Sequence, residues 1–169
     1  MKNNLRYLCI FAVVLSTTPV FATVWSLEAA LDGLQETPPN ASPGFGVASL
    51  SLDDVSGVVT VTSGSFSGLL SPATAMHIHG PAAPGVAAGV LIPLSVTLGT
   101  SGTFSGGGPL PPPLVADMLG GFTYLNIHTS AFPGGEIRGQ ISVVPEPSII
   151  ALAGMGAGAL LWQLRRKHS

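Results

Sequence analysis

The stretches that decide the fold read MHIHGP at residues 76–81 and YLNIHT at residues 124–129, the latter followed by PGGEIRGQI at residues 133–141. Apolar and polar residues alternate in them, as they do in β-strands that bury one face. Because side chains alternate with period two along a strand, His77 shares a face with His79, and Asn126 shares a face with His128. Most side chains that can do chemistry near neutral pH therefore lie in two places.

Short strands separated by turns also account for the rest of residues 23–143. The expected strands span residues 25–31, 46–52, 58–62, 74–78, 90–98, 102–105, 122–128 and 136–143. Glycine, proline, asparagine and aspartate cluster between them, which is typical of turns. The pattern predicts an all-β domain, an antiparallel Greek-key β-sandwich or barrel.

Two further segments of this domain have a distinct composition. Residues 111–118 predict the one short helix, ended by Gly120 and Gly121. Residues 106–108 are three consecutive glycines, and prolines follow at 109 and 111–113. Such a run predicts a connector that is flexible in its first part and stiff in its second.

The charge of the domain excludes one class of partner. Residues 23–143 carry seven acidic residues and one basic residue, Arg138, so their net charge is −6, while the whole chain has −2. Without a basic patch the domain has no electrostatic footprint for nucleic acid. Glu28, Asp32 and Glu36 are spaced by four, but Gly33 argues against a helix, so we expect these three carboxyl groups to be solvated.

The first 22 residues read as a secretory signal peptide. Lys2 and Arg6 precede an apolar run at residues 8–15, and VFA at residues 20–22 matches a small-residue cleavage site. The apolar run is shorter than the ~20 residues that a membrane span needs, so an uncleaved anchor ranks second. The single cysteine, Cys9, leaves with this segment, so the exported part has no disulfide.

The segment at residues 144–169 has three consecutive parts, namely a Pro-Glu-Pro motif, an apolar stretch at residues 149–164 and a basic cluster. The motif and the cluster consist of Pro145, Glu146, Pro147, Arg165, Arg166 and Lys167. The apolar stretch predicts a membrane helix with its basic end in the cytoplasm, which places the domain outside.

This tail closely resembles the PEP-CTERM sorting signal of Gram-negative bacteria. The resemblance implies anchoring in the inner membrane, recognition by an exosortase-type enzyme, and removal of the helix. It also implies release to the cell surface or the extracellular matrix, often beside exopolysaccharide production. The alternative is a permanent single-span anchor, which ranks second.

The domain itself resembles the CHRD domain, first described in chordin and common in bacterial secreted proteins. The matching blocks are residues 31–39, Gly46 with the strand that follows it, and residues 66–69, 77–85, 124–129 and 133–141, and the resemblance extends over essentially all of residues 27–142. The resemblance implies an extracellular β-domain without established catalytic residues. We therefore expect a non-catalytic binding or structural module, with extracellular polysaccharide or protein as its partner.

The histidines leave two interpretations open. His77, His79 and His128 could offer three imidazoles to copper or zinc. The H-x-H strand is similar to one in copper–zinc superoxide dismutase, but the chain has no bridging histidine, metal loop or cysteine pair to match, which argues against dismutase activity. In the other interpretation, which ranks first, His77 and His79 join a polar network that fixes the register of the sheet. Its other members are Asn126, Glu136 and Arg138.

Overall fold

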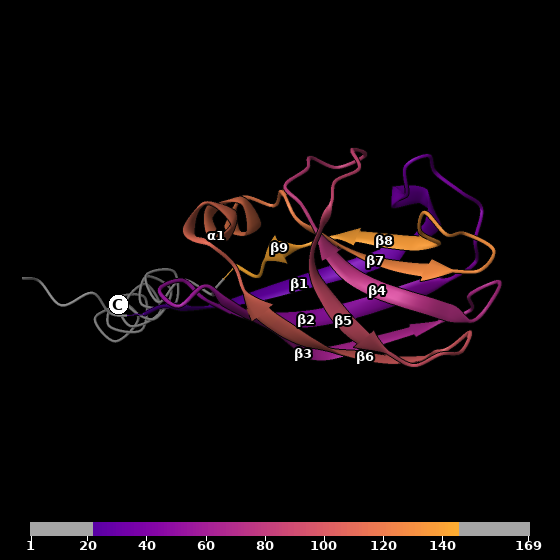
Figure 1. Cartoon of the computed structure of the whole chain (residues 1–169), viewed down its shortest axis with the longest axis horizontal. Coiled ribbons are helices and arrows are strands. Elements are labelled where there is room, and N and C mark those ends of the chain that lie inside the picture. Colours follow the sequence, from indigo (N-terminus) through magenta and orange to yellow (C-terminus); the bar gives the residue numbers. More distant parts are fainter. Residues whose placement is uncertain (1–21, 146–169) are drawn as a thin grey trace, which may run out of the picture.

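The computed structural model describes residues 22–145 (Figure 1). The expected signal peptide, the membrane helix, the basic cluster, and Glu146 and Pro147 of the sorting motif lie outside the described residues. Between residues 22 and 145, no helix has the length and apolar character needed to cross a membrane.

The described chain consists of β-strands and short helices. They are β1 (Val24–Asp32), η1 (Gly33–Gln35), β2 (Phe45–Asp53), β3 (Val58–Ser67), β4 (Ala73–His79), β5 (Val90–Val96), β6 (Gly102–Pro109), α1 (Pro112–Leu119), β7 (Tyr124–Thr129), β8 (Ile137–Gln140) and β9 (Ser142–Val143). The strands hydrogen-bond in the order β2-β3-β6-β5-β4-β7-β8-β1, and β1 also pairs with β2, which closes an antiparallel eight-stranded barrel. The all-β prediction is confirmed. Of the two architectures left open by the sequence, sandwich and barrel, the structure is a barrel.

The order of the strands gives two overlapping Greek keys. Strands β4, β5 and β6 follow one another as neighbours, while β3 lies beside β6 and β7 lies beside β4. In each key, three consecutive strands are joined to a fourth that returns next to the first. The second return, from β6 to β7, carries α1, which lies at one end of the barrel (Figure 1). This topology places the two histidine-bearing strands side by side.

The barrel core is apolar and follows the period-two pattern of the strands. In β1, Leu27, Ala29 and Leu31 are buried, and the residues between them face outward. Met118 of α1 also joins the core. Each fully buried aliphatic side chain contributes about 1.5–3 kcal/mol. All eight barrel strands, β1 to β8, supply buried apolar side chains, so the core can hold the barrel closed without a disulfide.

The glycine run at residues 106–108 is part of a strand, so the prediction of a connector was wrong. Gly106, Gly107 and Gly108 pair with Val61, Thr60 and Val59 of β3. A Cβ atom at Gly107 would run into the backbone carbonyl of Val59. Gly107 is therefore needed because β3 and β6 approach closely there, beside an irregular register. The run resembles a linker in composition alone.

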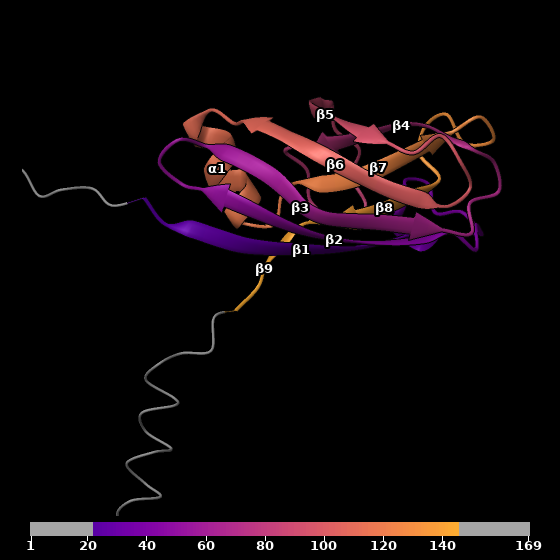
Figure 2. The same ribbon diagram turned by 90° about the horizontal axis from the view of Figure 1, so that it is seen from below.

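The barrel has two unlike walls, which lie over one another in Figure 2. The open wall consists of β1, β2, β3 and β6, and its outer side chains alternate with buried ones along β1 and β2. The covered wall consists of β4, β7 and β8, and five of the six residues of β7 are buried. Three connections, at residues 33–44, 80–89 and 130–136, lie over the outer face of the covered wall (Figure 1).

Candidate functional site

The three histidines of the domain lie on the outer face of the covered wall. His77 and His79 come from β4 and His128 from β7, and the antiparallel register places Asn126 opposite His77. The residues between them point into the core, where Ile78 is fully buried. The shared faces expected from alternation are therefore present, and the topology brings the two faces together.

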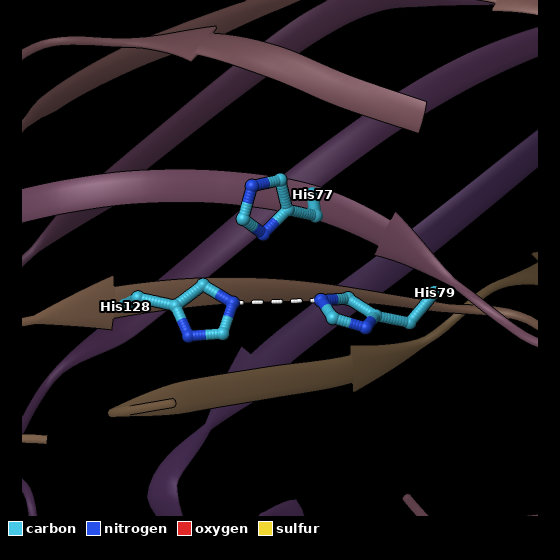
Figure 3. A group of neighbouring side chains, drawn as sticks. All are labelled: His77, His79 and His128. Atoms are coloured by element: carbon cyan, nitrogen blue, oxygen red, sulfur yellow. Dashed lines mark hydrogen bonds between the residues drawn. The ribbon is translucent and has the colours of Figure 1, made fainter. Parts of the chain in front are cut away.

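The three imidazole rings converge on one point in space. One nitrogen of each ring lies within 4.8 Å of a nitrogen of each of the other two. The closest pair is His79 Nε2 and His128 Nε2, at 3.4 Å. Figure 3 shows these two rings facing one another, with a nitrogen of the His77 ring turned toward the space between them.

Backbone carbonyls fix the proton positions of two of the rings. His79 Nδ1 lies 3.0 Å from the carbonyl oxygen of Ala88, and His128 Nδ1 lies 3.0 Å from that of Pro133. A carbonyl oxygen can only accept, so each Nδ1 carries a hydrogen and donates it. In the neutral rings, Nε2 then has a free lone pair. His77 Nδ1 is buried and has no hydrogen-bond partner.

The surroundings favour the neutral form of two of these rings. Burial lowers the pKa of His77, and the neighbouring His128 lowers it further. Burial also lowers the pKa of His79, although its bond to the Ala88 carbonyl acts in the opposite direction. Neutral imidazole is the form that binds a metal ion.

The His79 ring is the first member of a stack of three side chains, followed by Tyr124 and Arg138. Tyr124 lies nearly parallel to it, with ring centroids 5.0 Å apart and an interplanar angle of 8°. Arg138 lies over the Tyr124 ring, with its Cζ atom 3.4 Å from the ring centroid, which is a cation–π contact. The Tyr124 hydroxyl also accepts a hydrogen bond from the Ala88 backbone N–H, at 2.9 Å. Ala88, whose carbonyl accepts from His79 Nδ1, is thus itself hydrogen-bonded to a member of the stack.

Arg138 is buried and connects the loops above the covered wall. Its guanidinium donates to the carbonyl of Val86 at 2.9 Å, to Thr37 Oγ1 at 3.3 Å and to the carbonyl of Ala83 at 3.4 Å. It also donates to Gln140 Oε1 at 3.3 Å. This one side chain therefore holds both the 33–44 loop and the 80–89 loop against the barrel.

Glu136 forms a separate cluster. Its Oε1 accepts from Ser42 Oγ and from the Leu70 backbone N–H, both at 2.6 Å, and its Oε2 accepts from Thr129 Oγ1 at 2.7 Å. The structure thus places the expected network residues in distinct groups. Glu136 binds Thr129 of β7 and two loop donors, Arg138 contacts Tyr124 and loop carbonyls, Asn126 donates to the Gly134 carbonyl, and the histidines lie with one another.

Glu36 was expected to be solvated, and that expectation was wrong, because the 33–44 loop folds onto the covered wall and leaves it 6% exposed. Burial raises the pKa of Glu36 to about 7. Its Oε1 and Asn126 Oδ1 are both buried without a hydrogen-bond partner, and a Cβ atom at Gly135 would run into both side chains. Glu36 and Arg138 line a cavity of about 410 Å³.

Three residues of the site were missed by the sequence reasoning, namely Glu36, Tyr124 and Gln140. Gln140 Nε2 donates to the carbonyls of Gly121 and Ala82, at 2.7 and 3.0 Å. Their signal was present, because all three lie inside the sequence blocks that resemble the CHRD domain. Nothing in the local alternation, however, distinguishes a polar residue that faces water from one that faces a covering loop.

The comparisons with known proteins identify the domain and the tail. The model of the CHRD domain family matches residues 27–141. The chain belongs to this family. The model of the PEP-CTERM protein-sorting motif matches residues 143–167, directly after the CHRD barrel. Neither the curated proteins nor the solved structures include a significant match to the chain.

The sorting motif shows that the CHRD barrel is exported. It implies export, anchoring in the membrane before processing, and processing by an exosortase-type enzyme. The barrel ends at β9, which pairs with β1, and Val144 N–H still donates to the Ser26 carbonyl at 2.9 Å. The next residue, Pro145, is exposed. The first residue of the motif is therefore accessible immediately beside the folded domain.

Proposed function

We propose that the CHRD barrel acts at the cell surface or in the exopolysaccharide matrix as a non-catalytic binding or structural module. The observation that carries the proposal is the sorting motif that begins where the last strand ends. A protein of this kind has to work outside the cell as a small, independently folded unit. A closed barrel without a disulfide meets that requirement through its own core.

The proposed route has three steps. Residues 1–22 direct export, the apolar stretch at residues 149–164 holds the chain in the inner membrane, and the exosortase-type enzyme removes that stretch after the Pro-Glu-Pro motif. The barrel, at residues 23–143, is then released. The accessible Pro145 supports this order, because the enzyme can reach the motif without unfolding the domain.

The loops over the covered wall support a binding role. They enclose two cavities, of about 410 and 280 Å³, that share Glu36, Thr37 and Pro39. Arg138 and Gln140 line the larger one with hydrogen-bonding groups. A few polar groups on a rigid support are what a binding site requires. Polysaccharide or protein of the matrix is the proposed partner.

Fractionation of cells tests the route. In a host with the exosortase, we expect barrel antigen in the surface and matrix fractions, with a mass that lacks residues 149–169. Deletion of the exosortase, or alanine at Pro145, Glu146 and Pro147, should leave the full-length chain in the inner membrane. The control Glu28→Ala changes an exposed residue of β1 and should be processed normally. Full-length protein retained in the exosortase-positive host would refute the route.

A second candidate function is metal binding by His77, His79 and His128. The convergence of their nitrogens within 4.8 Å favours it. It is compatible with the first, because a matrix module can carry an ion as its ligand.

A further inference from the structure

We propose that His77, His79 and His128 bind one divalent transition-metal ion, copper(II) in preference to zinc, through three imidazole nitrogens with one coordination position left open. This inference deepens the proposed function by naming a ligand for the module, and it rests on that function only for its location outside the cell. The sorting route and the metal site can fail independently.

Two nitrogen lone pairs of the site point toward each other. The carbonyls of Ala88 and Pro133 hold the hydrogens of His79 and His128 on Nδ1, as described above. The two Nε2 atoms then face each other at 3.4 Å with nothing to donate. Two acceptors at this distance repel, so a proton or a cation belongs between them.

The spacing suits a metal ion. With metal–nitrogen bonds of about 2.0–2.1 Å, two ligands lie about 3.4 Å apart in a tetrahedral site and about 2.9 Å apart as neighbours in the square-planar arrangement typical of copper(II). The His79 and His128 nitrogens, 3.4 Å apart, have the tetrahedral separation already and need to approach by only about 0.5 Å for the square-planar one. The His77 nitrogen, within 4.8 Å of the others, reaches the same distance by rotation about its side-chain torsions. Its unpartnered Nδ1 has no hydrogen bond to lose in that rotation.

The chemistry of the donors selects the ion. Three neutral imidazoles suit copper and zinc, whereas calcium and magnesium prefer oxygen ligands. For a given nitrogen site, copper(II) binds more tightly than zinc. The cluster contains histidines alone, so the bound ion keeps its positive charge in a domain whose net charge is −6. That charge favours uptake of a cation.

The support around the rings is that of a preorganised site. In metal centres, a ligating histidine commonly donates its second N–H to a backbone carbonyl, which fixes the ring and its tautomer. His79 and His128 both do so. Tyr124 stacks on the His79 ring and holds its plane, and Arg138 in turn lies over the Tyr124 ring. His77 and His128 are half-buried, so an ion can enter from solvent and a water molecule can occupy the open position.

Metal analysis of the full chain, purified in mild detergent without a histidine tag, tests the proposal. We expect one copper per chain after loading with copper(II) and desalting, and an electron paramagnetic resonance spectrum with hyperfine coupling to three nitrogens. Zinc should compete at least about 10-fold more weakly. The variant His128→Ala should lower copper affinity by at least about 100-fold, since removal of a ligand costs no less than removal of its support.

The fourth histidine gives a matched control. His168→Ala alters the sequence outside the barrel and should leave copper affinity unchanged. Because His128→Ala could disturb folding, His77→Ala is a second test: its Nδ1 has no partner, so its thermal unfolding should match that of the wild type while affinity falls. Less than stoichiometric copper, equal affinity in the wild type and both barrel variants, or loss of binding in His168→Ala overturns the proposal. A processed matrix protein that binds no metal overturns this inference and leaves the proposed module intact.

Discussion

The open wall and the covered wall share one core, but the outer face of the open wall is in water and that of the covered wall lies beneath loops. Along β2 of the open wall, Val47 is 55% exposed between buried neighbours, as is usual for an antiparallel sheet with one face in water. Along β7 of the covered wall, Leu125 and Asn126 point to opposite faces and both are buried. The covered wall therefore separates two interiors, an apolar one inside the barrel and a polar one beneath the loops.

The polar interior belongs entirely to the covered side. In residues 22–145, the buried polar side chains all lie in this wall, just before β7, or in the loops above it, and they are Glu36, His79, Thr123, Asn126, Thr129, Glu136 and Arg138. Buried polar groups generally need partners, and five of the seven hydrogen-bond to a loop or to a neighbouring residue, whereas Glu36 Oε1 and Thr123 Oγ1 have no partner. The barrel core thus supplies stability, while polar contacts of the covered wall fix the loops and position the histidines.

The largest expected difference between the walls comes from truncating a buried carboxyl group. Glu136→Ala removes the acceptor for Ser42, Leu70 and Thr129 and leaves those donors unsatisfied. We expect the free energy of unfolding to fall by about 4 kcal/mol. On the open wall, the exposed Glu28→Ala should change it by no more than about 0.5 kcal/mol. Chemical denaturation of both variants checks this, and equal losses would remove the distinction between the walls.

Arg138→Met should have the next largest effect, about 3 kcal/mol, because it removes the donors that hold the loops to the barrel. Hydrogen exchange should increase at residues 80–89, while the backbone of β2 stays protected. Thr37→Val removes only one of the guanidinium's acceptors and should cost less than about 1 kcal/mol. Exchange that increases evenly over both walls would contradict the assignment of Arg138 to the loops.

Within the open wall, two adjacent glycines should differ. Gly107→Ala places a Cβ atom against the Val59 carbonyl, a backbone group that cannot move aside without opening the pairing of β3 and β6. We expect a loss of about 2 kcal/mol. At Gly108 the nearest atom, in Ile92, lies 3.7 Å away, so Gly108→Ala should be nearly neutral. Thermal unfolding of the pair measures the difference, and a tolerated Gly107→Ala would mean that the strands are not in this register.

The same glycines show where prediction from sequence stops. Alternation and turns predicted the all-β class, and the pairing of β1 with β2 was needed to decide for a barrel. Residues 106–108 were misread because a glycine strand has no side-chain pattern, and the reason for glycine lies on another strand, at Val59. Local sequence carries no information about such a long-range contact.

The candidate site was also predictable in part: its histidines followed from the sequence, but their convergence and the burial of Glu36 did not. The shared face of His77 and His79 follows from strand period alone, and the sequence patterns named His128 as the third member. Their convergence depends on the Greek-key return that puts β4 beside β7. Glu36 could not be placed, because its burial depends on how the 33–44 loop folds over the covered wall. Loop placement is decided by tertiary contacts such as those of Arg138.

The smallest expected effect is a pH dependence that Glu36 gives to the covered wall. Burial raises its pKa to about 7 in the folded protein, from an ordinary value of 4.5. Between these values the folded protein holds a proton that the unfolded chain has released, so the free energy of unfolding falls as pH rises from about 4.5 to about 7 and levels off above. Because solvent reaches the carboxyl group from the adjoining cavities, we expect a change of about 1 kcal/mol.

Two variants isolate this proton. Glu36→Gln keeps the shape of the side chain and cannot titrate, so its unfolding free energy should be flatter than that of the wild type between pH 4.5 and 7. Glu28→Gln makes the same change at an exposed position of β1 and is the matched control for the substitution itself. Since the wild type and Glu36→Gln have every other titrating group in common, the difference between their curves reports Glu36 alone. Parallel curves would mean that the carboxyl group sits in water, and that the 33–44 loop does not close over the covered wall.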